Sequence, residues 1–177
     1  MPVTSLPLNV EIETKAVLRK TASARSALAE LKGIITTIPN ENILIETLTL
    51  QEARESSAIE NIISTFAEVY QSSLFNLQFA SPAAKEVHQY SEALKLGFGL
   101  VKKHGILTNN FILQMHRVIE QNDAGFRTLP GTKLLNDRTG AVVYEPPQDG
   151  EIIKQLMANL EEFINNDELM DADPLVK

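Results

Sequence analysis

The chain has 177 residues, of which 44% are hydrophobic and 22% charged, a composition typical of an ordinary globular protein. Its 16 basic and 23 acidic residues give a formal net charge of −7, which argues against a protein that binds DNA through clustered Lys and Arg. The absence of cysteine excludes disulfides, a thiolate nucleophile and cysteine-based metal sites.

Residues 1–10 show no basic segment followed by an apolar run, and nowhere do 18 apolar residues follow one another. We therefore expect a cytoplasmic protein with no membrane partner. Residues 1–10 themselves are expected to form an arm without partners.

Apolar residues at steps of three and four predict helices in the first two thirds of the chain. The first covers residues 11–37 and ends before Pro39, because proline lacks a backbone donor and disfavours a helical residue before it. Asn40 is a good cap for a second helix over residues 41–77, either continuous or briefly broken near 47–50.

Ser81 and Pro82 form a strong start signal, with serine as the cap and proline at the first helical position. The third helix that they begin is expected to end at Gly105. Thr108 caps a fourth helix, whose apolar residues are Phe111, Ile112, Met115, Val118 and Ile119.

The chain changes character after the fourth helix and predicts a short β-hairpin. Residues 132–136 and 141–144 flank a loop in which Gly140 can adopt positive φ. The two prolines at 146–147 end the hairpin, and Asp149 caps a last helix. The predicted fold is therefore all-α with one β-hairpin.

One helical stretch carries a candidate site. Ser56 and Glu60 are one helical turn apart, next to apolar positions at helical spacing, and no Lys or Arg lies one turn after Glu60. We expect a cationic partner from elsewhere in the protein; the simpler alternative is a solvated helix carboxylate. The predicted apolar face consists of Ala53, Ile59, Ile62, Ile63, Phe66, Val69 and Tyr70.

Ser56-Ser57-Ala58-Ile59-Glu60-Asn61 fits the pattern (S/T)xxxE(G/N), and the chain resembles the Fic family, in which this pattern marks an inhibitory helix. Further stretches resemble that family in the same order. They are Leu113–Ile119 (similar to "LHxxL"), Gly125-Phe126-Arg127 (similar to "GxxR"), Val142–Pro147 (the end of a β-hairpin called the flap), and Leu156–Asn165 with Asp173–Lys177, which resemble the approach to the catalytic helix.

The resemblance implies a Fic-like helical bundle, with an N-terminal helical region at 1–80 and the first part of the Fic core at 81–177. It implies an inhibitory site at Ser56, Glu60 and Asn61, where Glu60 would pair with an arginine of the catalytic signature. It also implies a flap that docks a target protein carrying a Ser, Thr or Tyr hydroxyl. The implied target-docking residues are Leu134, Leu135, Asn136, Val142, Val143 and Tyr144.

The family signature HPFx(D/E)GNGRxxR is not among these 177 residues, although the pattern places it just after Lys177. The resemblance therefore predicts the N-terminal and pre-catalytic part of a protein adenylyltransferase that uses ATP and Mg in its complete form. This chain itself is expected to lack catalytic residues, metal ligands and a cofactor, and to be inactive. The alternatives are a catalytically dead interaction module from a truncated Fic gene, able to form a homodimer, and an unrelated helical domain.

Overall fold

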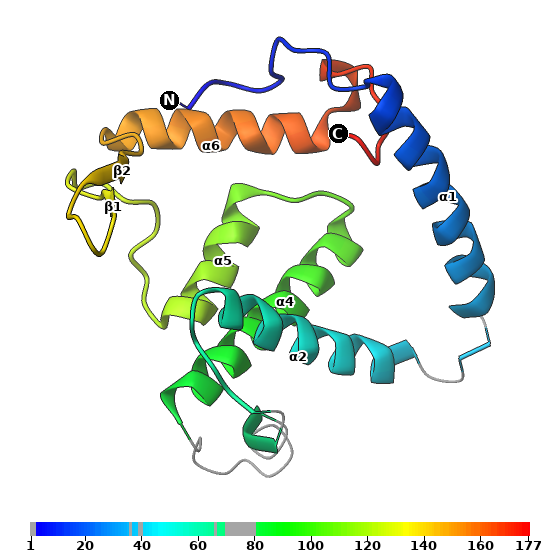
Figure 1. Ribbon diagram of the computed structural model, residues 1–177, viewed down its shortest axis with the longest axis horizontal. Helices are drawn as coiled ribbons and strands as arrows, with labels where there is room; N and C mark the ends of the chain where they lie inside the picture. The colour runs from blue at the N-terminus through cyan, green and yellow to red at the C-terminus, as the bar shows by residue number, and fades with distance from the viewer. Residues whose placement is uncertain (1–2, 36, 39–40, 66, 70–80) are drawn as a thin grey trace. The chain divides into compact units, whose positions relative to one another are not determined.

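A computed structural model describes the chain apart from residues 1–2, 36, 39–40, 66 and 70–80 (Figure 1). It confirms the mostly helical fold with one two-stranded antiparallel hairpin. The elements are α1 (Lys15–Ile35), α2 (Glu41–Ile59), α4 (Pro82–His104), α5 (Asn109–Glu120), β1 (Leu134–Leu135), β2 (Val142–Tyr144), α6 (Gly150–Asn165) and the 3-10 helix η1 (Asp167–Leu169).

The chain divides into two compact units. Unit 1 consists of Met1–Ala29, Ile106–Asn109 and Ala124–Lys177, and unit 2 of Glu30–Gly105 and Asn110–Asp123. The predicted break at Pro39 and Asn40 lies outside the described residues. The predicted boundary between residues 80 and 81 lies at the edge of the undescribed residues 70–80. The division at residue 80 stays a prediction. Among the helices that are described, none combines the length and apolarity needed to cross a bilayer.

Unit 2 is built on the packing of α2 against α4. Its core consists of Leu50, Ala53, Val69 and Val87, which are at most 6% exposed, and Tyr90 packs against them. Burial of such side chains is the main favourable term in folding. On α2, this core ends at Ala53, three residues before the candidate motif.

The predicted boundaries of α4 are confirmed. The side chain of Ser81 accepts a hydrogen bond from the Ala84 N–H (3.1 Å), and Pro82 is the first helical residue. Gly105 ends the helix in the left-handed conformation (φ 71°), and its N–H donates to the carbonyl of Val101. Both ends therefore form as local sequence signals dictate.

Unit 1 contains α6, which is capped by Asp149 as predicted: this side chain accepts from the N–H groups of Glu151 and Ile152. The amide of Asn159 on α6 accepts from the Leu6 N–H (2.6 Å) and donates to the Leu6 carbonyl (2.9 Å). The prediction that residues 1–10 lack partners is therefore wrong. An asparagine amide carries both a donor and an acceptor and can satisfy both backbone groups of one residue.

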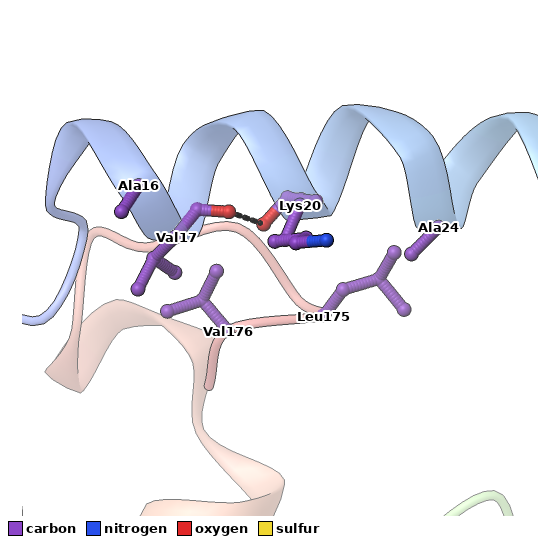
Figure 2. Close-up of a pocket in the computed structure, with 7 residues that line it drawn as sticks. Ala16, Val17, Lys20, Ala24, Leu175 and Val176 are labelled. Atoms are coloured by element: carbon purple, nitrogen blue, oxygen red, sulfur yellow. Dashed lines mark hydrogen bonds between the residues drawn. The ribbon is translucent and has the colours of Figure 1, made fainter.

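The last residues of the chain are tied to α1. The guanidinium of Arg25 donates two hydrogen bonds to Asp173 (2.7 and 2.9 Å), and the Asp173 N–H donates to Glu13 (2.8 Å). Leu175 and Val176 point toward α1 and line a groove of about 390 Å³ with it (Figure 2). The α1 residues that line this groove are Ala16, Val17, Lys20, Thr21 and Ala24.

Candidate functional site

The motif lies at the C-terminal end of α2, where the helix stops earlier than predicted. α2 is continuous through residues 47–50 and ends at Ile59, so Glu60 lies in the turn that follows. Asn61 has a left-handed backbone (φ 64°). The prediction of a helix through Glu60 is therefore wrong, and its predicted end near Leu77 lies outside the described residues.

Three backbone hydrogen bonds define this helix end. The N–H groups of Glu60 and Ile62 both donate to the carbonyl of Ser57 (3.0 Å each), and the Asn61 N–H donates to Ala58 (3.0 Å). This pattern, with a left-handed residue just past the helix, is a Schellman motif. Asparagine is the residue type other than glycine that most readily adopts this conformation, so the identity of residue 61 explains the stop.

The chain becomes helical again only after a second local signal. The Thr65 side chain accepts from the Glu68 N–H (3.2 Å), while the Glu68 carboxylate accepts from the Thr65 N–H (2.7 Å) and hydroxyl (2.8 Å). This reciprocal pair is a capping box. The backbone hydrogen bond from Thr65, followed by the one from its hydroxyl, lowers the pKa of Glu68 below its ordinary value. The helical residues that follow are 67–69 within the described part.

Ser56 is on the last turns of α2 but is not paired with Glu60. Its hydroxyl donates to the carboxylate of Glu52 (2.6 Å), which also accepts from the Tyr90 hydroxyl of α4 (3.2 Å). Glu52 thus links the motif helix to its packing partner. Neither Glu52 nor Tyr90 was predicted as a site residue; a Glu four residues before Ser56 was the only sequence signal for this contact.

Glu60 is exposed, and in the described part of the chain its carboxylate forms no hydrogen bond or ion pair. Its neighbours Ile59 and Ile63 are 87% and 75% exposed, whereas Ala53 and Val69 are buried. The predicted apolar face is therefore wrong at Ile59 and Ile63, and the turn at Asn61 is what takes Ile63 off the helix. Phe66 and Tyr70 lie outside the described residues.

The predicted docking residues lie on the hairpin, with its strands shorter than the predicted ranges. Tyr144 pairs with Leu134 and Val142 with Leu135, with an irregularity between the two pairs. The Asn136 side chain accepts from the N–H groups of Arg138 and Thr139 (3.0 Å each), which shapes the loop before Gly140 (φ 67°). Four exposed apolar side chains cover the strands: Leu134, Leu135, Val142 and Val143.

Residues 18–99 match the family model described as the Fic/DOC family N-terminal region. The match supports a Fic family protein over the N-terminal part of the chain. The match includes all of α2 and the whole motif from Ser56 to Asn61. The hairpin lies after the matched Fic region, so its identification as a flap remains a prediction.

The neck of the hairpin consists of the segments just outside strands β1 and β2. Two side chains that the sequence analysis does not predict hold these segments together. Gln148 accepts from the Gly131 N–H (2.6 Å) and donates to the carbonyls of Thr132 (3.0 Å) and Pro146 (2.6 Å). Arg127 donates to the carbonyl of Pro147 (2.7 Å). Only Arg127 carried a sequence signal, since it ends the GxxR-like turn.

Over the ranges that the structure covers, no group of three or more His, Asp or Glu side chains could hold a metal ion.

Proposed function

We propose that this chain is the N-terminal and pre-catalytic part of a Fic-type protein adenylyltransferase, and that Glu60 is its autoinhibitory residue. Such an enzyme transfers AMP from ATP to a protein hydroxyl and releases pyrophosphate. The HPFx(D/E)GNGR signature, which would supply the base and the phosphate-binding loop, is not in these 177 residues. The chain contributes regulation and target docking, and it acts in the cytoplasm.

The observation that carries this proposal is an electrostatic conflict at the end of α2. The C-terminal end of a helix is partially negative, so a carboxylate there is disfavoured by about 0.3–1 kcal/mol. Glu60 lies just past that end, and the last turn of α2 contains no basic residue. A guanidinium placed at this point would relieve the conflict, because it would attract both the carboxylate and the helix end.

The surroundings of Glu60 fit a surface that another part of the protein covers. Ile59 and Ile63 flank Glu60 in the sequence and are strongly exposed. A segment that brings an arginine to Glu60 would also remove these two side chains from water, at about 25 cal/mol for each Å² of apolar surface buried. Apolar contacts and a charged pair would then act together.

The inhibition would operate by competition for charge. An arginine paired with Glu60 is not available to bind the γ-phosphate of ATP, since a guanidinium in a bidentate pair uses the donors that a phosphate needs. Without that contact ATP would bind in a non-productive position. Displacement of Glu60 would free the arginine and switch on AMP transfer.

The hairpin would hold the target. In a two-stranded sheet each strand has an edge without a ladder partner, and an extended peptide can add a strand there. The exposed apolar side chains of β1 and β2 would then contact alternate side chains of the target. We propose a target protein that presents its Ser, Thr or Tyr hydroxyl in such a segment.

The test is AMP labelling from radioactive ATP, measured on the full product of the encoding gene. Glu60→Gly and Glu60→Gln should each raise self-labelling about tenfold or more, because a charged hydrogen-bonded pair contributes about 1.5–3 kcal/mol. Glu46→Gln is the matched control, since Glu46 is another exposed carboxylate on α2. Unchanged labelling in both Glu60 variants would refute the proposal.

A second candidate function is an interaction module without chemistry, able to bind a protein or a second copy of itself. The observation in its favour is a row of exposed apolar side chains near the end of α1: Leu28, Leu31, Ile34 and Ile35. A stable dimer in size-exclusion chromatography, together with no heat of ATP binding in a calorimetric titration of the gene product, would favour this function over the first.

A further inference from the structure

We infer that Asn61 is a positioning residue for Glu60, acting through its left-handed backbone and not through its side chain. This inference rests on the proposed function of Glu60. Among the described residues other than glycine, only Asn61 and Gln121 have positive φ. Asn61 directly follows Glu60, so its conformation decides whether α2 ends there or continues.

The left-handed turn at Asn61 takes the chain that follows Glu60 off the path of α2. Because residue 61 is left-handed, the chain turns back and the Ile62 N–H bonds to Ser57. In a continuous helix, residues three and four positions further on would instead lie one turn above Glu60. Ile63 and Ser64 would then cover the place where an arginine has to approach.

The left-handed conformation is sterically unfavourable for a residue with a Cβ atom. This shifts the equilibrium between the left-handed and right-handed conformations of that residue about five- to thirtyfold toward the right-handed one. The free-energy cost of the left-handed conformation is smaller for asparagine than for alanine or glutamine, and glycine has no such cost. Alanine and glutamine also favour helix more than asparagine does. The residue at position 61 therefore sets the fraction of molecules in which Glu60 is available.

The hydrogen bonds of the turn support this backbone role. They run from the N–H groups of Glu60, Asn61 and Ile62 to carbonyls of α2, and every partner is a main-chain atom. Glycine at position 61 can form the same set. Glutamine would keep the amide but lose the conformational preference.

The experiment compares three substitutions in the full product of the encoding gene. Asn61→Gly should keep self-labelling at the low level of the unchanged protein. Asn61→Ala and Asn61→Gln should raise it by about threefold to tenfold, toward the level of Glu60→Gly. Rescue by glycine, which lacks any side chain, separates a backbone role from a general loss of stability.

NMR of the 177-residue chain provides the second readout. The Cα chemical shifts of residues 60–63 should indicate the turn in the unchanged chain and in Asn61→Gly, and helix in the other two variants. If Glu60→Gly raises labelling while Asn61→Ala and Asn61→Gln do not, the inference fails and the proposed function stands. The inference also fails if α2 still ends at Ile59 in those variants. If Glu60→Gly has no effect, the proposed function itself fails.

Discussion

Truncation of Leu50 tests the packing that carries the motif turn. Leu50 is 6% exposed in the α2–α4 core, whereas Leu48 on the same helix is 56% exposed. Leu→Ala in a core costs about 2–5 kcal/mol, and the low end applies here because the cluster is small and its surroundings can relax. We therefore expect Leu50→Ala to lower the free energy of unfolding by about 2–3 kcal/mol.

Leu48→Ala is the matched control, because it changes helix propensity by the same amount and leaves the core intact. It should cost no more than about 0.5 kcal/mol. The measurement is urea unfolding of the 177-residue chain followed by circular dichroism, with the midpoints compared at equal slope. Equal losses for the two variants, or a larger loss for Leu48→Ala, would refute the assigned packing of α2 on α4.

Two further predictions concern the rest of the fold. In α4, a Cβ atom at Gly97 would overlap the sulfur of Met115, while one at Gly99 would meet no atom within 4 Å. Gly99→Ala should therefore stabilise the protein by about 0.5–1 kcal/mol in thermal unfolding. Gly97→Ala should not show this gain, because the Met115 side chain must move to make room. The Leu175 N–H and then Arg25 hold the pKa of Asp173 below its ordinary value of 3.8, so Asp173 stabilises the fold above that pH and the contribution is lost as the pH falls through the lowered pKa. Asp173→Asn should reduce stability near neutral pH and flatten its decline in acid, as measured by thermal unfolding over a range of pH.

Local signals made the helix ends predictable where a single residue decides them. Ser81 with Pro82, Gly105 and Asp149 act within a few residues of their own position, and the structure has the predicted boundaries there. Asn61 is also a local signal, and Thr65 with Glu68 is another. The predicted pattern misses them because the apolar residues on both sides fit one amphipathic helix.

Contacts between distant parts of the chain could not be predicted in this way. Asn159 bonds to Leu6, and Asn165 accepts from the Leu107 N–H (2.9 Å) and donates to its carbonyl (2.6 Å). Asn109 donates its side-chain amide to the carbonyl of Met157 (2.9 Å). The local sequence pattern does not indicate that an asparagine bonds to a residue more than 40 positions away. Hydrogen bonds of this kind can therefore be identified only from the structure.

The neck of the hairpin has a consequence for how such proteins diversify. Gln148 and Arg127 bond to main-chain atoms, and those atoms are the same whichever side chains the strands carry. Substitutions at the exposed positions of β1 and β2 leave these bonds in place. The exposed surface of the two strands can therefore change, during evolution or by design, without loss of these hydrogen bonds.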